Sequence, residues 1–445
     1  MRVFIRVLAL FFVMAVPAAG AGGLGPGGPS FWIGRLGAPD SVVLGPGEIE
    51  ELNSRITGRI DQMADVAGMP DEVPGGRLLE WLLFDPVPGP DEPRFDADGE
   101  PLGEGFFEGI VRNMALDRVA SANTVRFGVV VGRADVRAFP SDAKVIKRPG
   151  GFDTLQYSAI FPTEPVALLH TSRDGGWGFF QTRFVRGWIR LESVAMTDRS
   201  GLRAGDGRFI VVTGSSVPVY SDASSGREVM RLPMGTVLYV PEDGVEGEGV
   251  IPVWLPRGSA KGLIWKTGYV ARRADVSEGY LPYTRASVIS QAFKMFGEEY
   301  GWGGDGGLRD CSAYVRDVFA SVGVRLPRNS RQQGAVGQIV LGRERAGTPG
   351  EIGRALAEAD PGVTLLGLDG HIMLYLGVLE EKPYVIHQIW GYMDGSALKE
   401  IGKVAVTGLE LGAGTEAGSL RERIKSVSEV RLPPRFAGQR PAEGL

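Results

Sequence analysis

Reactive sulfur and imidazole are scarce in this chain: its 445 residues include one cysteine and three histidines. Because Cys311 is the only thiol, the chain cannot form an internal disulfide, and its stability has to come from packed cores. The cysteine and the histidines lack the spacing of metal ligands, and no glycine-rich phosphate loop is present. The sequence therefore implies no metal and no organic cofactor.

A long apolar run and an excess of positive charge are also missing. The apolar run at residues 7–16 is too short to span the ~30 Å hydrocarbon core of a bilayer. The formal net charge is -5, which differs from the basic footprint of a nucleic-acid-binding protein. We therefore expect no nucleic-acid partner and no stable membrane anchor.

The first 21 residues have the pattern of a secretory signal peptide. Arg2 and Arg6 precede the apolar run, and Ala19-Gly20-Ala21 offers the small residues that a signal peptidase requires. A membrane anchor is the alternative interpretation, whereas the lack of a cysteine at this site excludes a lipid-modified N-terminus. We expect an exported, soluble protein that is periplasmic or secreted.

Glycine and proline are abundant, with 66 and 29 residues, and this composition favours short strands over long helices. Apolar residues recur with helical spacing at 49–63 and 106–114, so residues 22–124 are predicted to form an N-terminal helical stabilising segment. From residue 125 the pattern changes to short strands, in two blocks that end alike in Gly187-Trp188-Ile189 and Gly268-Tyr269-Val270. This layout resembles tandem bacterial SH3-like domains, two small β-barrels at residues 125–195 and 205–276.

Helical and strand-like patterns follow one another over residues 283–432, as expected for an α+β domain with a helix packed on a sheet. The predicted fold class is therefore multidomain α+β. After the signal peptide at 1–21 come a helical segment, two small β-barrels and a C-terminal α+β domain.

Cys311 stands where a helix is expected to begin. Asp310 is a good N-cap, which places Cys311 in the first turn, where exposed N–H groups and the helix dipole stabilise a thiolate. The apolar residues that follow recur with the period of a helix, at Val315, Val318, Phe319 and Val322. A lone thiol in this place is either a nucleophile or a buried, inert side chain, and this stretch alone leaves both possibilities open.

A cysteine nucleophile needs a base, and histidine is the usual one near neutral pH. His170 lies in the first strand block, where a packed strand residue is the simpler interpretation. His371 and His387 lie on two adjacent predicted strands that form a hairpin centred near Glu381. In that register His387 stands opposite Tyr375, on the face of His371 but four residues, or about 13 Å, away. The hairpin thus predicts a shared face, and contact only with strong twist or a different register.

Five short motifs occur in the last third of the chain: Tyr300-Gly-Trp302-Gly-Gly, Asp310-Cys311-Ser312, Leu326-Pro327-Arg328-Asn-Ser330, Gly370-His371 and Tyr375-Leu-Gly377. Together, over about residues 285–430, they resemble the NlpC/P60 family of papain-like cysteine peptidases. The helical segment and paired SH3-like blocks are similar to the multidomain branch that includes the YkfC-type γ-D-glutamyl-L-diamino acid endopeptidases.

The resemblance implies a catalytic role for four residues. Cys311 corresponds to the nucleophile, His371 to the general base and acid, and His387 to the polar residue that orients His371. Tyr300 corresponds to the tyrosine whose hydroxyl joins the Cys311 N–H in stabilising the oxyanion. The interval between the two histidines is a few residues longer than is usual in the family, which leaves the assignment of His387 open.

Further matches concern the substrate pocket, and they are Asp310, Ser312, Trp302 and Ser330. In the multidomain branch, Asp310 and groups from the first SH3-like domain hold the free α-amine of an N-terminal L-Ala. An N-cap role alone is equally compatible with Asp310. The branch also places a tyrosine and a glutamate of the first SH3-like domain at the pocket. Here residues 177–180 offer phenylalanines instead of a hydroxyl, and Glu164 is the candidate acidic residue.

The resemblance implies an exported, monomeric cysteine endopeptidase that hydrolyses the γ-D-glutamyl–L-diamino acid bond of peptidoglycan stem peptides with a free N-terminal L-Ala. Two alternatives come from other classes of protein. One is a Cys–His amidase or acyltransferase that acts on another substrate. The other is an inert protein that binds the cell wall through its SH3-like blocks, and the intact set of Cys311, His371 and His387 argues against it.

Overall fold

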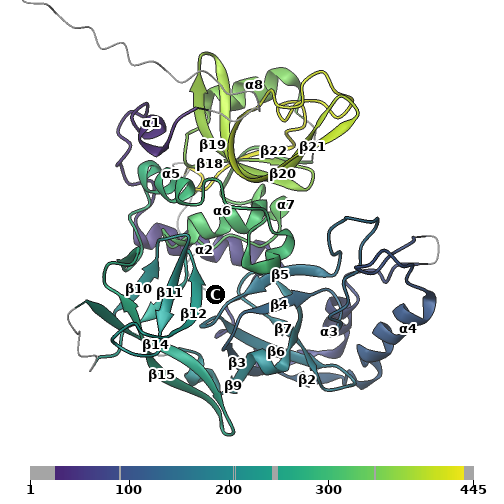
Figure 1. Cartoon of the computed structure of the whole chain (residues 1–445). Helices are drawn as coiled ribbons and strands as arrows, with labels where there is room; N and C mark the ends of the chain where they lie inside the picture. Colours follow the sequence, from purple (N-terminus) through teal and green to yellow (C-terminus); the bar gives the residue numbers. More distant parts are fainter. Residues whose placement is uncertain are drawn as a thin grey trace, which may run out of the picture.

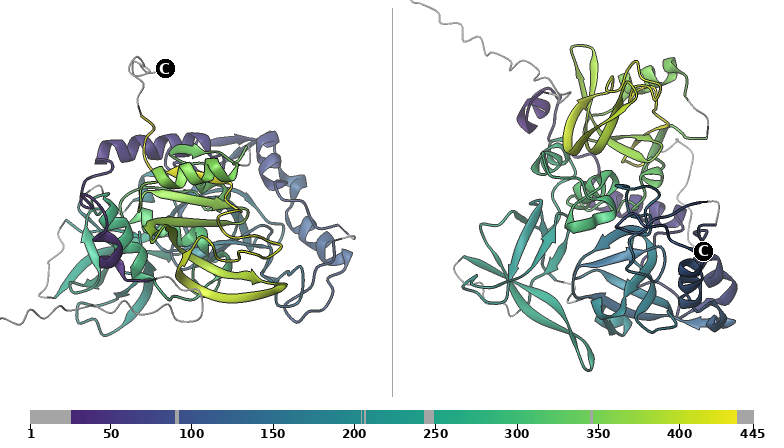
Figure 2. Two further views of the ribbon diagram at one scale, coloured as in Figure 1. Left: turned by 90° about the horizontal axis from the view of Figure 1, so that it is seen from above. Right: turned by 45° about the vertical axis from the view of Figure 1, so that its right-hand side comes forward.

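The computed structural model describes residues 26–434 except for residues 90–91, 204, 206, 243–248 and 345–346. Figure 1 shows two strand-rich units side by side and a unit of helices and strands above them, with helix α6 (Cys311–Ala320) at the junction. The oblique view in Figure 2 shows the same arrangement. The predicted mixed helix and strand architecture is confirmed. The predicted signal peptide at residues 1–21 lies outside the described residues.

The first strand-rich unit is an antiparallel sheet of seven strands in the order β5-β4-β8-β7-β6-β3-β9. Successive residues of its strands pack into cores on opposite faces, as the period of a strand requires. Phe179 thus joins the cluster that includes helix α3 (Gly75–Leu82), and Phe180 joins the cluster on the other face. The strands are β3 (Arg126–Val130), β4 (Ala134–Arg137), β5 (Gln156–Ile160), β6 (Pro165–Thr171), β7 (Trp177–Gln181), β8 (Arg186–Arg190) and β9 (Val194–Thr197).

The second strand-rich unit consists of two antiparallel sheets, ordered β12-β11-β15-β14 and β13-β10-β16. Their strands are β10 (Phe209–Val212), β11 (Ser216–Tyr220), β12 (Glu228–Pro233), β13 (Val237–Tyr239), β14 (Val250–Ser259), β15 (Gly262–Ala271) and β16 (Val276–Glu278). Among the described residues, the strand order of neither unit closes on itself, so the expected barrels are open sheets. The boundaries 125–195 and 205–276 stay predictions.

The N-terminal segment divides its packing between two units. Its helices are α1 (Pro29–Ile33), α2 (Pro46–Arg59), α3 (Gly75–Leu82) and α4 (Glu104–Asn113), and β1 (Glu72–Pro74) pairs with β2 (Ala122–Thr124). Trp32, Leu52 and Ile56 lie in the core of the C-terminal unit. By contrast, α3 and α4 pack on the first sheet. Three short 3₁₀ turns follow α4 and β8 and β9 in the chain, at Leu116–Arg118, Leu191–Ser193 and Arg199–Leu202. The segment therefore packs on both the C-terminal unit and the first sheet.

The C-terminal unit is a six-stranded antiparallel sheet, β17-β22-β18-β19-β20-β21, with helix α6 packed on β19 and β20. Its helices are α5 (Arg285–Lys294), η4 (Trp302–Gly307), α6 (Cys311–Ala320), α7 (Ser330–Gln333) and α8 (Pro349–Glu358). Its strands are β17 (Gln338–Leu341), β18 (Thr364–Leu368), β19 (His371–Leu379), β20 (Lys382–Asp394), β21 (Ala397–Gly408) and β22 (Ser426–Glu429). Val315, Val318 and Phe319 are buried in the core between α6 and the sheet, as their spacing predicts.

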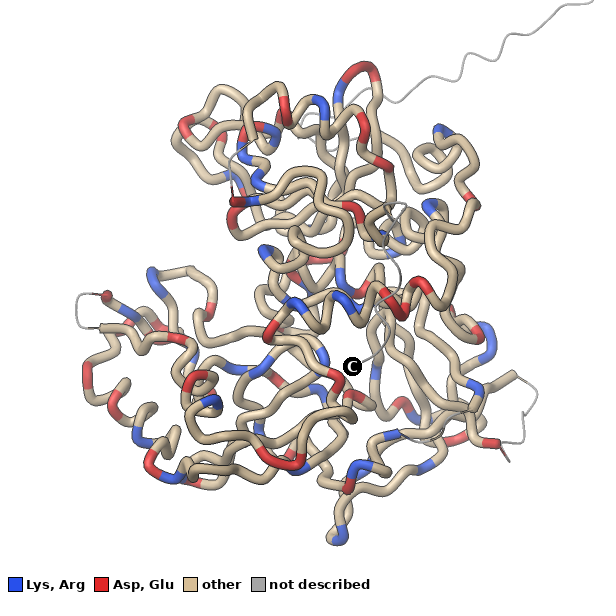
Figure 3. Tube along the Cα trace, turned by 180° about the vertical axis from the view of Figure 1, so that it is seen from behind, with Lys and Arg blue, Asp and Glu red and all other residues tan. Residues whose placement is uncertain are grey.

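Charged residues are distributed over all three units. Figure 3 shows Lys and Arg interspersed with Asp and Glu along the trace. Within the ranges that the structure describes, no helix has the length and apolar character needed to cross a membrane.

Candidate active site

The Cys311 thiol lies at the N-terminus of α6, where the sequence predicted it. Asp310 is the N-cap, and its side chain accepts hydrogen bonds from the N–H groups of Ser312 and Ala313. The thiol is 6% exposed, and its Sγ lies 3.9 Å from the carbonyl oxygen of Gly370. Since Gly370 directly precedes β19, the start of that strand packs against the thiol.

The two histidines of β19 and β20 are in direct contact. Nε2 of His371 lies 2.7 Å from Nδ1 of His387, and Nε2 of His387 lies 3.0 Å from Oγ1 of Thr407 on β21. The ring nitrogen of His371 left for proton transfer is therefore Nδ1. For Nδ1 to act as a base, Nε2 must carry the proton and donate to His387, which in turn donates to Thr407.

The register of the β19–β20 hairpin differs from the prediction by two residues. A hairpin centred near Glu381 predicts His387 opposite Tyr375, whereas Tyr375 pairs with Val385 and Leu374 with Ile386. The cause is an irregularity between Tyr375 and Gly377 together with a tight turn at Glu380 and Glu381, both with positive φ. This register brings His387 two residues closer to His371 than predicted, so the two rings not only share a face of the sheet but also form a hydrogen bond.

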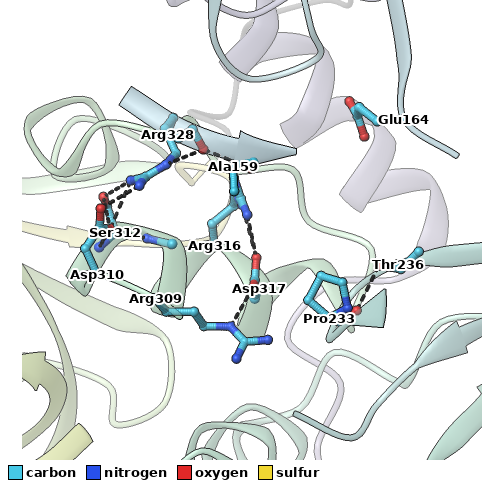
Figure 4. Close-up of polar contacts among 12 residues, drawn as sticks. Ala159, Glu164, Pro233, Thr236, Arg309, Asp310, Ser312, Arg316, Asp317 and Arg328 are labelled. Atoms are coloured by element: carbon cyan, nitrogen blue, oxygen red, sulfur yellow. Dashed lines mark hydrogen bonds and ion pairs between the residues drawn. The ribbon is translucent and has the colours of Figure 1, made fainter. Parts of the chain in front are cut away.

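Asp310 is fully engaged by neighbouring donors. Its Oδ1 accepts from Ser312 Oγ at 3.0 Å and from Arg328 Nη1 at 3.0 Å, in addition to the two capping N–H groups. Its Oδ2 accepts from Gly303 N at 3.1 Å and from Arg328 Nη2. Figure 4 shows Arg328 directed at Asp310 and Ser312. A carboxylate offers about four lone-pair sites, so no acceptor site remains for a substrate ammonium.

Arg328 also connects the C-terminal unit to the first sheet. Its Nε donates to Ser158 Oγ on β5 at 2.8 Å, and its side chain is 6% exposed. Burial of Asp310 is opposed by the charge and hydrogen bonds of Arg328, which together lower the pKa of that carboxyl below its usual value. The Asp310–Arg328 ion pair therefore stabilises both the N-terminus of α6 and the contact between the C-terminal unit and the first sheet.

Replacing Arg328 with methionine is expected to destabilise the fold by about 3–5 kcal/mol, because Asp310 would remain as an unpaired buried charge. Urea unfolding would measure the loss. The exposed Arg331 provides the control, since Arg331→Met should change the free energy of unfolding by less than ~0.5 kcal/mol. Equal stability of the two variants would contradict the expected role of the buried pair.

An aromatic cluster forms one side of the site. Trp302, 38% exposed, stacks on Phe152 at 4.9 Å and donates from Nε1 to the carbonyl of Asp153 at 2.9 Å. Tyr300 lies 5.7 Å from Phe152 and 5.6 Å from Trp390, between ring centroids. Burial raises the pKa of Tyr300, so its hydroxyl stays protonated and able to donate.

A cavity of about 490 Å³ brings most of the predicted site residues together. It is lined by Tyr300, Trp302, Asp310, Cys311, Ser312, Arg328, Ser330 and Gly370 from the C-terminal unit. The first sheet adds Tyr157 from β5, whose hydroxyl is buried and has no hydrogen-bond partner in the described part of the chain. The N-terminal segment adds Gln62, Phe84 and Asp85. The cavity is therefore built by three parts of the sequence.

Glu164 is not brought to this cavity. Its carboxylate pairs with the Arg183 guanidinium at 2.9 and 2.5 Å, and both residues line a different cavity. Figure 4 shows Glu164 well apart from Asp310. His170 bonds the carbonyl of Met114 at 3.0 Å, in line with its interpretation as a packed strand residue.

The sequence pattern does not indicate the roles of four residues near the site: Tyr157, Arg328, Thr407 and Asp85. Arg328 belongs to a motif that was recognised, but its partner could not be read from the motif. Tyr157 of the first sheet lines the cavity, whereas Phe179 and Phe180, in the stretch where the family branch suggests a hydroxyl, are core residues. Asp85 lies in a Pro-rich and Asp-rich stretch that gave no signal beyond a loop.

The resting thiol and imidazole are both neutral. Burial, reinforced by the charge of Asp310, raises the pKa of Cys311 to about 12, against the opposing effect of the first-turn N–H groups. Burial also lowers the pKa of His371 to about 4 and that of His387 well below its usual value. The effect of desolvation on the thiol pKa is thus larger than the expected stabilisation of a thiolate by the helix N-terminus. The thiol proton therefore has to leave during attack on a substrate.

Alkylation of Cys311 should report this neutral state. The thiolate fraction rises about tenfold per pH unit below the thiol pKa, so the rate with iodoacetamide should keep rising from pH 7 to 10. A free cysteine, with a pKa near 8.5, reaches its maximum rate by about pH 9.5. Mass spectrometry of samples quenched at each pH would give both curves. A plateau for Cys311 below pH 8 would instead indicate a stabilised thiolate.

The described residues contain no group of three or more His, Cys, Asp or Glu side chains arranged to hold a metal ion. The chemistry that the site offers on its own is that of a thiol, an imidazole pair and phenolic donors. These groups are suited to nucleophilic attack on a carbonyl.

Sequence comparison identifies two domains in the chain. The NlpC/P60 family matches residues 297–388, and the SH3 domain (SH3b1 type) matches residues 149–190. A segment of 47 residues is 47% identical to the probable endopeptidase p60 of Listeria monocytogenes. That segment spans 10% of this chain and 10% of the relative, so the likeness concerns one region only.

Solved structures share the fold over a larger part of the chain. A NlpC/P60 endopeptidase from Photobacterium damselae subsp. piscicida superposes with a TM-score of 0.69 at 18% identity, over 91% of this chain and 97% of the other. A NlpC/P60 family protein from Bacillus cereus superposes with a TM-score of 0.50 at 14% identity, over 69% and 100% of the two chains. The resemblance inferred from the five motifs is confirmed: residues 297–388 form a NlpC/P60 family domain, downstream of an SH3 domain at residues 149–190.

Proposed function

We propose that this chain is an exported cysteine endopeptidase that hydrolyses the γ-D-glutamyl–L-diamino acid bond of peptidoglycan stem peptides. The observation that carries the proposal is that Cys311, at the start of α6, lies against Gly370, the residue before His371, and that His371 is hydrogen-bonded to His387, all inside the NlpC/P60 region. A thiol next to a base that is itself oriented by a third group is the arrangement of a nucleophilic hydrolase.

The proposed reaction begins with proton transfer from the thiol to Nδ1 of His371. Sγ of Cys311 forms a bond to the carbonyl carbon of the γ-D-glutamyl residue, and the carbonyl electrons move to its oxygen. The Cys311 N–H and the Tyr300 hydroxyl donate to that oxyanion. Ser312 and Ala313 give their N–H groups to Asp310, so the first-turn N–H of Cys311 is the one assigned to the substrate.

Collapse of the oxyanion breaks the bond to nitrogen, and His371 gives its proton to the leaving amine of the diamino acid. Water then gives a proton to His371 and adds to the thioester, which releases the γ-glutamyl product and restores the thiol. His387 accepts from Nε2 of His371 throughout, and this is supported by the 2.7 Å contact between the two rings.

The proposed substrate carries a free N-terminal L-Ala, as in the YkfC-type branch. Walls from the first sheet and the N-terminal segment narrow the cavity beside Cys311, which favours a short peptide over the intact wall polymer. Trp302, Ser312 and Ser330 are the proposed pocket residues of the C-terminal unit. The proposal includes export through the signal at residues 1–21 and a monomeric state.

Digestion of synthetic L-Ala-γ-D-Glu-diaminopimelate, free or N-acetylated, tests the proposal by mass spectrometry. We expect the dipeptide L-Ala-γ-D-Glu and the free diamino acid from the first peptide, with the acetylated peptide cleaved more slowly. Cys311→Ala should release neither product. Absence of cleavage after D-Glu by the native chain, or cleavage that survives in Cys311→Ala, would overturn the proposal.

A further inference from the structure

The Tyr300 side chain is held in place by the packing of its ring. Within the described part of the chain its hydroxyl makes no hydrogen bond, although the side chain lines the Cys311 cavity. Its backbone is fixed, since the Tyr300 N–H donates to the carbonyl of Gly402 at 2.8 Å. The direction in which the hydroxyl points therefore depends on the rings that contact the Tyr300 ring.

Phe152 contacts all the other rings of the aromatic cluster beside the cavity. Its ring stacks on Trp302, with the centroids 4.9 Å apart and the planes at 11°, and it meets Trp390 edge-on at 5.1 Å. The Tyr300 ring lies 5.7 Å from Phe152 and 5.6 Å from Trp390. Aromatic pairs at these distances attract one another beyond the burial of their area. The Tyr300 ring is thus packed against both Phe152 and Trp390.

Phe152 comes from the first sheet, in the loop between β4 and β5 and inside the SH3 match. The next residue, Asp153, fixes this loop. Its buried carboxylate pairs with Nη1 of Arg137 at 2.5 Å and accepts from the N–H groups of Val145 and Leu155 at 3.1 and 3.0 Å. A satisfied buried network of this kind is rigid, so the loop presents Phe152 in one position.

The same loop and strand β5 also hold the η4 turn, which carries Trp302. The indole Nε1 of Trp302 donates to the carbonyl of Asp153 at 2.9 Å. Nε2 of Gln156 donates to the carbonyl of Gly303 at 3.1 Å. Gly303 has a φ of +60°, and a Cβ there would lie 2.6 Å from the Gln156 side chain, so no other residue fits this approach. The first sheet therefore fixes the segment after Tyr300 as well as contacting its ring.

We propose that Phe152 is a positioning residue that directs the Tyr300 hydroxyl at the oxyanion, so that the first sheet takes part in catalysis without contacting the reacting atoms. The inference rests on the proposed function, in which Tyr300 and the Cys311 N–H donate to the oxyanion. Such a donor accelerates the reaction because it is oriented before the charge develops. Without the Phe152 ring the Tyr300 ring can turn into the vacated space, and the hydroxyl loses its fixed direction.

A double-mutant cycle between Phe152→Ala and Tyr300→Phe on L-Ala-γ-D-Glu-diaminopimelate tests the proposal. Tyr300→Phe should lower kcat about 10²-fold, the usual cost of one oxyanion donor. Phe152→Ala should lower kcat about 10-fold in the native chain but less than ~2-fold in Tyr300→Phe, where no hydroxyl remains to be positioned. Changes in KM report the contact of Phe152 with Trp302, so the cycle is evaluated on kcat. Equal losses of kcat in both backgrounds, or no loss in either, would overturn the proposal.

Phe106→Ala is the matched control. Phe106 is also partly buried, packs on the first sheet and contacts one other ring, but it lies outside the Cys311 cavity. It should keep the native kcat, and a loss as large as that of Phe152→Ala would show that any loosening of the first sheet lowers kcat. Phe152→Leu, which keeps most of the volume, should lower kcat about 3-fold. If Phe152→Ala does not unfold cooperatively in urea, the cycle is carried out with Phe152→Leu, and the same comparison of backgrounds decides.

Reaction with p-nitrophenyl acetate separates this inference from the proposed function. Sγ of Cys311 bonds to the acetyl carbon, p-nitrophenolate leaves with the electrons of the broken ester bond, and the thiol proton passes through His371 to water. The step forms the same oxyanion and uses no peptide contact. The rate is the release of p-nitrophenolate in excess of that by Cys311→Ala.

If the native chain reacts with this ester but cleaves no stem peptide, the proposed function fails and the cycle is decided on the ester. A loss in Phe152→Ala that disappears in the Tyr300→Phe background then supports the inference. Equal losses in the two backgrounds overturn it, and so does a native chain that reacts with neither compound, since Tyr300 then has no oxyanion to stabilise.

Discussion

Cys311→Ser is expected to keep the fold and to lower kcat/KM on the proposed stem-peptide substrate by about 10⁴-fold or more. The change removes little volume, and Sγ lies as far as 3.9 Å from the carbonyl oxygen of Gly370. A hydroxyl is far harder to deprotonate than a thiol. Burial has lowered the pKa of His371 to about 4, which makes it too weak a base for serine. Steady-state kinetics with mass-spectrometric product detection would measure the loss.

The raised pKa of the Cys311 thiol determines how the nucleophile is formed. With the Cys311 pKa raised to about 12, the enzyme cannot rely on a standing thiolate, and attack has to be concerted with proton transfer to His371. Thermal unfolding should coincide for Cys311→Ser and the native chain. A serine variant within tenfold of native activity would show that another group is the nucleophile.

The placement of Cys311 was predictable because it depends on neighbours in sequence. Asp310 caps the helix through residues two and three positions away, and the apolar residues of α6 follow with helical spacing. Such local signals need no knowledge of the remaining chain. The five motifs of the family were local in the same sense, and the NlpC/P60 match confirms them.

The contact between His371 and His387 was not predictable, because it depends on a strand register. The two-residue turn at Glu380 and Glu381 has positive φ at both positions. Glycine or asparagine at these positions would have indicated such a turn in the sequence. These glutamates give no such signal. The sequence also gives no signal of the irregularity after Tyr375. The turn and the irregularity together change the register by two residues.

The engagement of Asp310 and the exposure of Asp85 to the cavity depend on contacts between distant segments. Arg328 reaches Asp310 and also Ser158 of the first sheet, and Asp85 reaches the cavity because α3 packs on that sheet. The family resemblance implies an amine-binding role for Asp310, the carboxylate next to Cys311 in sequence. Among the described lining residues, the carboxylate without a hydrogen bond or ion pair is that of Asp85, on a segment without a recognisable motif.

The second large effect is expected from the histidines, and their variants should fall in a fixed order. His371→Ala should lower kcat by about 10⁴-fold, since the proton of the thiol then has no acceptor. His387→Leu should cost about 10²-fold, because the ring of His371 loses the acceptor that fixes its tautomer. His387→Asn should recover part of that loss, since an amide oxygen can accept from Nε2 of His371.

The order of the losses in kcat reports which nitrogen of His387 carries the proton. His387 stays neutral, because burial and the neighbouring His371 hold its pKa well below its usual value. It can therefore accept from His371 only while its own proton lies on Nε2, bonded to Thr407. Thr407→Val removes that acceptor, and kcat should fall about 10-fold or less while His387 stays in place. Steady-state kinetics of the four variants at pH 7 would establish the ranking. Equal losses in His387→Asn and His387→Leu would mean that His387 contributes only packing, and a greater loss in Thr407→Val than in His387→Leu would contradict the proposed direction of the hydrogen bonds.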